Sequence, residues 1–403
     1  MPRILHISTR LILGGSQENT VLSCEGQARL GHDVHLAFGP IYGPEGSLLD
    51  RVQNFRTADN RGITTHVIPD MVREVAPLRE RRALAQLTRL IREIKPDVVH
   101  THSSKAGILG RIAAWRLLPD LPQMRVIHTI HGPPFMPVEG SPLNRAKVAI
   151  NNTIYTLAER IAARHCHTIV SVADAMTQQF LARGIGNPSQ YITIRSGMEI
   201  APFLAARELD QLAIRRELGL APDDFVIGTV ARLAQHKGHD DLIDALADEL
   251  RTRPHWKLLW VGDGWWRDRL EARLTSLNLR DRVILTGLVP PQRVPALMRA
   301  MDVLAHPSYR EGLPRTVPQA LLAGALPVAY DVDGTGEICR DMQTGRLVPL
   351  AHIAKLCEAI VWAHEHPDER AAMIRRGQAE CERDFSAERM VERLEQVYFQ
   401  TSG

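Results

Sequence analysis

The sequence predicts an α/β protein with parallel sheets, divided into two domains. Short β-branched apolar runs alternate with segments of helical periodicity through both halves of the chain, a pattern typical of repeated βα units. The length of 403 residues suits two domains of roughly 200 residues each. Strand periodicity stops between residues 196 and 210, so we expect domains at residues 1–199 and 200–386.

Each predicted strand is a short apolar run that ends at polar residues, as buried parallel strands do. In the first half these runs are residues 4–8, 33–38, 64–68, 97–101, 126–130 and 168–172. In the second half they are residues 225–230, 257–261, 283–286, 303–305 and 326–329. Helices are expected between them, among others at residues 15–30, 78–94 and 144–163, from about residue 238, and at 387–400.

The composition is that of an ordinary globular protein, with 44% hydrophobic and 24% charged residues. No apolar run approaches the ~20 residues of a transmembrane helix. The first residues begin a strand at once and show no signal-peptide pattern. The five cysteines are odd in number and lack CxxC spacing. We therefore expect a cytoplasmic protein with reduced cysteines.

The net charge of +3 hides an asymmetry between the halves. Residues 1–199 hold 23 Lys and Arg against 16 Asp and Glu, a balance of +7, whereas residues 200–403 hold 26 against 30, a balance of −4. A basic N-terminal half suits an anionic acceptor or peripheral attachment to an acidic membrane, although a solvated surface without a partner fits equally well. A pI near 8.6 and the lack of a nucleic-acid-binding motif argue against a nucleic-acid partner.

The stretch at residues 310–328, REGLPRTVPQALLAGALPV, is the most informative part of the chain. It places Glu311 and Gln319 around the start of an apolar helix, which Pro318 predicts to begin near residue 315 or 316. Free backbone N–H groups and the positive end of the helix dipole attract an anion there. The pattern predicts a carboxylate for sugar hydroxyls, a phosphate site and an amide for a ribose.

A second stretch, FVIGTVARLAQHKGHDD at residues 225–241, supplies cations. Arg232 and Lys237 follow the carboxyl end of a predicted strand, where open α/β sheets bind ligands. Two cations near a helix N-terminus oppose its dipole, which favours a bound anion over a role as ordinary surface charges. An arginine fork and a lysine point charge together suit a diphosphate.

These segments resemble the retaining glycosyltransferases of family 4, whose GT-B fold has two facing Rossmann-like domains with a cleft between them. The resemblance covers nearly the whole chain. It is carried, in the family's order, by LHISTRLILGGSQENTVLSCEGQARLGHDV, DVVHTHSSKAGILGRIAA, IHTIHGPPF, GTVARLAQHKGHDDLIDAL, LLWVGDG and REGLPRTVPQALLAGALPV. It implies sugar transfer from a nucleotide-diphosphate sugar, with UDP-sugars favoured, to a saccharide or polyprenyl-linked acceptor. Retention of configuration, no cofactor and no metal are also implied.

The resemblance also implies a role for each matching residue. The expected catalytic residues are His131, which begins HGPPF, and Glu311. The donor diphosphate is expected to contact Arg232, Lys237, Gly15, Gly312 and Leu313, and the ribose Gln319. The acceptor side is expected to include Gly14, Ser16, His102 and Lys105. A donor phosphate oxygen would take the acceptor's proton, so no protein base is assigned. The last helix, residues 387–403, is expected to pack back on the first domain.

Gln319 departs from the family pattern, which usually has a second Glu at this position. An amide still accepts one hydrogen bond from a ribose but loses charge assistance, a cost of about 1 kcal/mol. Two alternatives therefore stay open. One is a nucleotide-sugar epimerase or hydrolase of the same fold, and the other is a catalytically weak nucleotide-sugar binding protein.

Two motifs near the first strands have a second interpretation. Gly14 and Gly15 permit positive φ and a close backbone approach, or they make an ordinary tight βα turn. Four histidines cluster near two predicted strand ends, where a metal site is conceivable: His100, His102, His128 and His131. Because no carboxylate or cysteine completes a recognisable ligand set, we expect no metal there.

Three features of the remaining sequence are also ambiguous. Asp331 and Asp333 spell the DxD of metal-dependent glycosyltransferases with another fold, but the following turn favours a loop. Trp265 and Trp266 either pack the next helix, which we favour, or stack on an acceptor. The helix at residues 144–163 mixes apolar and basic positions, and we favour core packing over membrane docking.

Overall fold

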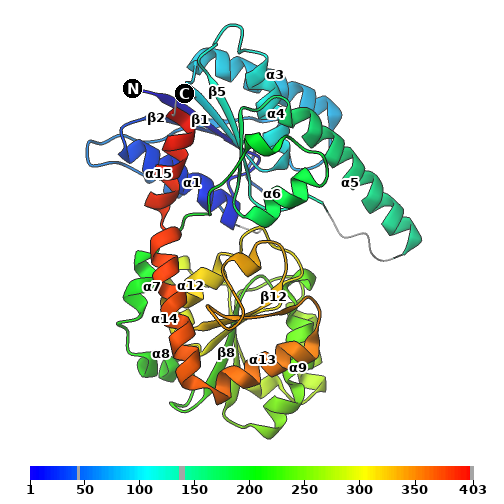
Figure 1. Ribbon diagram of the computed structural model, residues 1–403, viewed down its shortest axis with the longest axis vertical. Coiled ribbons are helices and arrows are strands. Elements are labelled where there is room, and N and C mark those ends of the chain that lie inside the picture. The colour runs from blue at the N-terminus through cyan, green and yellow to red at the C-terminus, as the bar shows by residue number, and fades with distance from the viewer. Residues whose placement is uncertain (43–45, 136–140, 400–403) are drawn as a thin grey trace. The chain divides into compact units, whose positions relative to one another are not determined.

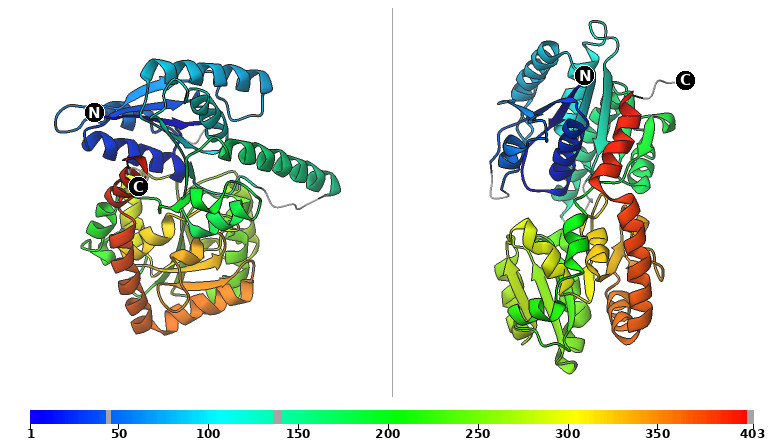
Figure 2. Two further views of the ribbon diagram at one scale, coloured as in Figure 1. Left: turned by 45° about the horizontal axis from the view of Figure 1, so that its top comes forward. Right: turned by 90° about the vertical axis from the view of Figure 1, so that its left-hand side faces the viewer.

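The computed structural model describes residues 1–42, 46–135 and 141–399 (Figure 1). The chain divides into two compact units. The N-terminal unit comprises Met1–Met198 and the C-terminal segment from Ala387, and the C-terminal unit comprises Glu199–Ser386. Each unit is a parallel sheet with helices on both faces, and the boundary lies one residue before the predicted one (Figures 1 and 2).

The N-terminal unit contains seven parallel strands in the order β3-β2-β1-β4-β5-β6-β7. They are β1 (Arg3–Ser8), β2 (Asp33–Phe38), β3 (Thr64–Val67), β4 (Val98–His102), β5 (Arg125–Ile130), β6 (Thr168–Ser171) and β7 (Tyr191–Thr193). Its helices are α1 (Gly15–Arg29), α2 (Leu49–Asn54), α3 (Pro77–Ile94), α4 (Ser104–Trp115), α5 (Pro142–Ala163), α6 (Asp174–Leu181) and α15 (Ala387–Phe399). Every residue of β4 is buried, as expected of a central parallel strand.

The C-terminal unit contains six parallel strands in the order β10-β9-β8-β11-β12-β13. They are β8 (Phe225–Val230), β9 (Trp256–Val261), β10 (Val283–Gly287), β11 (Val303–His306), β12 (Leu326–Asp331) and β13 (Arg346–Pro349). Its helices are α7 (Ala201–Ala206), α8 (Gln211–Glu217), α9 (His239–Thr252), α10 (Arg267–Ser276), α11 (Val294–Arg299), α12 (Thr316–Ala323), α13 (Ile353–Glu365) and α14 (Pro367–Asp384).

The predicted fold class is confirmed, and each predicted strand is present. The prediction missed β7 and β13, which lie at the edges of their sheets. The three residues of β7 are only half-buried, and β13 begins with Arg346 and ends with Pro349. An edge strand needs no continuous apolar run, so its sequence lacks the signal that identified the others.

The C-terminal helix α15 packs against α1, within the N-terminal unit. Its buried face includes Met390, Val391 and Leu394. A Cβ atom at Gly26 of α1 would lie 2.5 Å from a methyl group of Val391, so glycine permits this close helix contact. Near the end of α15, the Tyr398 hydroxyl forms a hydrogen bond with His100 Nδ1 in the centre of the sheet. The last helix therefore supports a strand that leads to the candidate site.

Candidate active site

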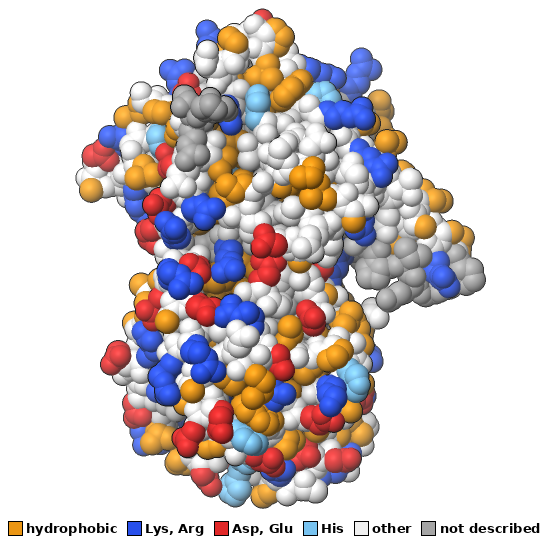
Figure 3. Space-filling view, in the orientation of Figure 1, with side chains coloured by type: hydrophobic (Ala, Val, Ile, Leu, Met, Phe, Trp, Pro, Cys, Tyr) orange, Lys and Arg blue, Asp and Glu red, His pale blue; other side chains and the backbone are white. Residues whose placement is uncertain are grey.

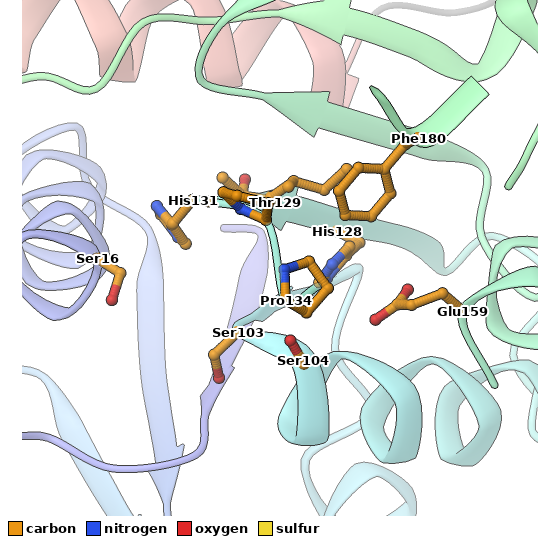
Figure 4. A pocket seen from close by; sticks show the side chains of 12 residues that line it. Ser16, Ser103, Ser104, His128, Thr129, His131, Pro134, Glu159 and Phe180 are labelled. Atoms are coloured by element: carbon orange, nitrogen blue, oxygen red, sulfur yellow. The ribbon is translucent and has the colours of Figure 1, made fainter. Parts of the chain in front are cut away.

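A pocket of about 340 Å³ lies at the carboxyl ends of β4 and β5 in the N-terminal unit (Figure 4). Its wall includes Ser16 from the first turn of α1, Ser103 and Ser104 at the start of α4, and His131 directly after β5. Loops at the carboxyl ends of parallel strands commonly form binding sites, because those ends meet along one edge of the sheet. Hydroxyl and imidazole groups share the wall with the apolar Pro133, Pro134 and Phe180, a mixture that suits a sugar.

A row of buried side chains supports His131 from behind. His131 Nε2 lies 3.1 Å from His102 Nδ1, His102 Nε2 lies 2.9 Å from His6 Nδ1, and His6 Nε2 lies 2.6 Å from Gln27 Oε1. A carbonyl oxygen only accepts, so with the Gln27 amide in this orientation His6 carries its hydrogen on Nε2. If the rings are neutral, His6 Nδ1 then accepts a hydrogen bond from His102 Nε2, and His102 Nδ1 accepts one from His131 Nε2. His131 therefore donates through Nε2 to His102 Nδ1.

The histidines behind His131 are uncharged at neutral pH. Burial lowers the pKa of His6 to about 4, despite the opposing effect of its hydrogen bond to Gln27. Burial, and next the neighbouring imidazoles, lower the pKa of His102 well below its ordinary value. This Gln27–His6–His102–His131 relay therefore orients a ring without placing a buried charge next to it.

His100 lies beside the relay and completes a cluster of three buried histidines. Ligand nitrogens of His6, His100 and His102 all lie within 4.8 Å of one another, a spacing that a metal ion could bridge. However, His6 and His102 are hydrogen-bonded to each other, and the two ring nitrogens of His100 meet the hydroxyls of Tyr398 and Thr129. Protein partners thus explain this cluster, and the absence of a bound metal stays a prediction.

The two predicted donor segments meet in the C-terminal unit. Lys237 Nζ lies 2.5 Å from Glu311 Oε1, and His306 Nε2 lies 3.2 Å from the same oxygen. Burial alone would raise the pKa of the Glu311 carboxyl, but the ammonium of Lys237 and the ring of His306 hold it well below its usual range. Glu311 is therefore a fixed carboxylate just before the start of α12.

Backbone contacts hold the Lys237 and Glu311 loops together. Gly238 has a φ of +68°, and a Cβ atom there would lie 1.9 Å from the Pro307 carbonyl oxygen. Only glycine permits this approach. On the opposite side, Asp333 Oδ2 accepts a hydrogen bond of 2.7 Å from the Glu311 backbone N–H. The second Asp of the DxD sequence therefore serves to position Glu311.

Two family models match the chain. The model described as "Glycosyl transferase 4-like domain" matches residues 14–197, and the model described as "Glycosyl transferases group 1" matches residues 210–380. The chain belongs to the family 4 glycosyltransferases. It is an enzyme of the GT-B type, in which the first match falls in the N-terminal unit and the second in the C-terminal unit.

Individual relatives agree with this family. The chain is 26% identical over 362 residues to the UDP-Gal:alpha-D-GlcNAc-diphosphoundecaprenol alpha-1,3-galactosyltransferase of Escherichia coli, covering 89% of this chain and 87% of the relative. It is 27% identical to the 2-deoxystreptamine glucosyltransferase of Streptomyces kanamyceticus, covering 73% and 75%. The crystal structure of HepE from Anabaena in complex with UDP and glucose shares the fold, with a TM-score of 0.78, 21% identity and full coverage of both chains.

Only some of the acceptor-side residues implied by the glycosyltransferase resemblance lie in the wall of this pocket. Ser16 and His131 line the pocket, and His102 lies buried behind His131. Lys105 is instead held by Glu80, whose carboxylate lies 2.8 Å from its Nζ. Gly14 lies exposed before α1 with an extended backbone, at a φ of 178°.

The glycine pair does not use the positive φ that glycine permits. Neither Gly14 nor Gly15 is among the glycines with left-handed φ in the described residues. Gly15 begins α1, so the pair forms the helix start. A close approach of this backbone to the donor diphosphate stays a prediction.

The other residues expected at the donor site in the C-terminal unit lie on the two segments that carry Lys237 and Glu311. Gly312 and Leu313 lead from Glu311 towards α12, which begins at Thr316 within the predicted range, and Gln319 is half-buried in its first turns. Arg232 is exposed, and its guanidinium lies 5.6 Å from the centre of the Trp265 ring.

The adjacent residues Trp265 and Trp266 differ in burial. Trp265 is 67% exposed, so the packing role that the sequence favoured for it is wrong. Trp266 packs against the hydrophobic core of the C-terminal unit, as predicted. Trp265 therefore remains available for stacking, beside the Arg232 guanidinium.

Several residues of the pocket were missed from sequence. Arg111 and Glu159 form a buried ion pair of 2.6 Å, and Glu159 lines the pocket. Nothing distinguishes Glu159 from a surface acid in a helix of mixed character. His6 did leave a signal, because an imidazole interrupts the apolar first strand, and this strand pairs with the one that carries His100.

Proposed function

We propose that this glycosyltransferase moves a hexosyl group from a UDP-sugar to a polyprenyl-diphosphate-linked saccharide, with retention of configuration. The name of the Escherichia coli relative supports both the UDP-sugar donor and the diphosphoundecaprenol-linked acceptor. The HepE structure, which holds UDP and glucose in a shared fold, supports the same donor class. The basic N-terminal half suits an acceptor that carries a diphosphate and resides in a membrane.

The observation that carries the donor proposal is the Lys237–Glu311 pair beside the start of α12. Lys237 and Arg232 stabilise the negative charge that develops on the leaving diphosphate, together with the free backbone N–H groups at the helix start. Glu311 accepts hydrogen bonds from the sugar hydroxyls, and Gln319 binds the ribose. Each charge-assisted contact contributes roughly 1.5–3 kcal/mol.

The acceptor saccharide enters the N-terminal pocket, whose wall includes His131, Ser16 and Ser104. In the reaction, the acceptor oxygen forms a bond to the anomeric carbon while the bond from that carbon to the diphosphate breaks. The acceptor's proton passes to an oxygen of the leaving diphosphate, so the products are the glycoside and UDP. The reaction proceeds without a divalent metal, because Lys237, Arg232 and the helix start supply the positive charge.

The test is a transfer assay with the purified full-length chain and a short-chain GlcNAc-diphospholipid acceptor. UDP-galactose, UDP-glucose, UDP-N-acetylglucosamine and GDP-mannose are offered separately, with and without EDTA. Transfer from one UDP-sugar, with the donor's anomeric configuration retained by NMR, is expected. An inverted product, transfer from GDP-mannose alone, or isomerised or hydrolysed sugar without glycoside would contradict the proposal.

A further inference from the structure

Helix α5 carries a stripe of exposed apolar side chains. Leu143, Ile150, Ile154, Leu157 and Ile161 are 83%, 59%, 60%, 58% and 44% exposed. At 3.6 residues per turn, these five positions fall within an arc of about 60° around the helix axis. The side chains therefore form one continuous stripe along the helix, and the core packing that the sequence favoured for this segment is wrong.

The helix is anchored only near its C-terminal end. Among its described side chains the buried ones are Glu159, Ala162 and Ala163, and Glu159 is held by the buried guanidinium of Arg111. These residues lie on the face opposite the apolar stripe. The preceding turns extend from the rest of the N-terminal unit, and apolar side chains follow the outer edge of this projection (Figures 1 and 3).

The charges of α5 are complementary to an anionic surface. Lys147, Arg160 and Arg164 lie within about 90° of the centre of the apolar stripe, whereas Arg145 lies on the opposite face of the helix. The one acidic residue of the helix, Glu159, is buried and neutralised by Arg111. The exposed surface therefore combines an apolar stripe with cations alone, which is the pattern of helices that lie in the headgroup region of anionic membranes.

We propose that α5 docks the enzyme on an anionic lipid bilayer. The apolar stripe inserts at the boundary between headgroups and acyl chains, and the flanking cations reach the phosphates. None of the described helices is long and apolar enough to cross a bilayer, so this contact is a peripheral one. A second copy of the chain is a poorer partner, because pairing two stripes would bring their flanking cations together.

The position of α5 connects this surface to the acceptor pocket, and the inference rests on the proposed lipid-linked acceptor. Glu159, near the anchored end of the helix, is also part of the pocket wall (Figure 4). A polyprenyl-diphosphate acceptor is confined to the bilayer. Docking through α5 would therefore hold the pocket close to the membrane surface, where that acceptor is concentrated.

Flotation with lipid vesicles tests the proposal. The variant Ile150→Gln/Ile154→Gln/Leu157→Gln is compared with the wild type on vesicles of phosphatidylcholine alone and mixed with phosphatidylglycerol. The control variant Val75→Gln/Leu78→Gln/Leu288→Gln removes three other side chains that are 73%, 77% and 78% exposed. Full transfer of one such side chain is worth roughly tenfold, so the stripe variant should bind mixed vesicles at least about tenfold more weakly, while the control variant should bind normally.

Additional readouts separate this inference from the proposed function. High salt and the variant Lys147→Glu/Arg164→Glu should both weaken vesicle binding, whereas transfer to a water-soluble acceptor should be unchanged in all variants. Equal flotation of the stripe variant and the wild type would overturn the docking proposal even if transfer is observed. If light scattering shows that the wild type and the control variant are dimers and the stripe variant is a monomer, α5 binds a second copy of the chain and the docking proposal is overturned. If the wild type transfers sugar from none of the UDP-sugars, the proposed function is refuted. The vesicle-binding test of the docking proposal does not depend on that result.

Discussion

Replacing Lys237 by Met tests the donor site through both stability and activity. The Lys237 and Glu311 side chains are only 19% and 13% exposed, so the substitution leaves a largely buried carboxylate without its cation. Breaking a buried pair in this way costs about 3–5 kcal/mol, and the remaining exposure and the nearby His306 reduce this to about 2–3 kcal/mol. For a unit of this size the melting temperature should fall by about 4–12 °C at neutral pH.

The sign of the pH dependence follows from the Glu311 carboxyl. In the wild type its folded pKa lies below the unfolded value, so the pair stabilises the protein above about pH 4.5, and this contribution is lost as the pH falls. In Lys237→Met, burial without the cation raises the pKa, so the variant is penalised most at neutral pH. The difference in melting temperature should therefore shrink as the pH is lowered from about 8 to 5.

The matched control is the double variant Lys237→Met/Glu311→Gln, which removes both charges. It should recover stability to within about 1 kcal/mol of the wild type. Its transfer activity should stay low, because it lacks both the cation for the diphosphate and the carboxylate for the sugar hydroxyls. Scanning calorimetry and the transfer assay, run across this pH range, give both quantities. A single variant with wild-type melting temperature and rate at every pH would refute the reasoning.

Three further predictions concern the relay, the ribose and the metal. His102→Phe should lower kcat about tenfold with little change in the donor KM, because His131 loses its acceptor, and His102→Gln should recover part of the rate; a loss of stability without this kinetic split would reduce His102 to a structural role. Gln319→Glu should tighten UDP binding about fivefold in calorimetry by restoring a charge-assisted bond to the ribose, and weaker binding would remove Gln319 from the ribose site. EDTA should leave the transfer rate unchanged, and a loss restored by Mg²⁺ or Mn²⁺ would bring back the DxD hypothesis.

Most of the fold was predictable because both sheets are parallel and buried. Their central strands are rich in buried apolar residues, and such runs stand out in the sequence. The edge strands β7 and β13 lack this requirement and were missed. The exposed stripe of α5 could not be assigned from periodicity, because the same spacing of apolar residues suits a protein core and a membrane surface.

The candidate site was predictable where local rules dictate it. Lys237, Glu311 and the start of α12 follow from helix-end chemistry, and the structure brings the two side chains together. The support of His131 was not predictable, because it joins side chains from α1, β1 and β4 that meet only in three dimensions. Arg232 was expected beside the same anion; its guanidinium lies 5.6 Å from the centre of the exposed Trp265 ring, and its contact with a diphosphate stays a prediction.

Titration calorimetry tests most directly whether Lys237 and the start of α12 bind the donor diphosphate. It compares the binding of UDP and of uridine to the wild type and to Lys237→Met. If Lys237 and the start of α12 grip the diphosphate, the substitution should weaken UDP binding by at least about tenfold and leave uridine binding unchanged. Equal losses for both ligands, or no loss for UDP, would show that the diphosphate binds elsewhere and would contradict the claim.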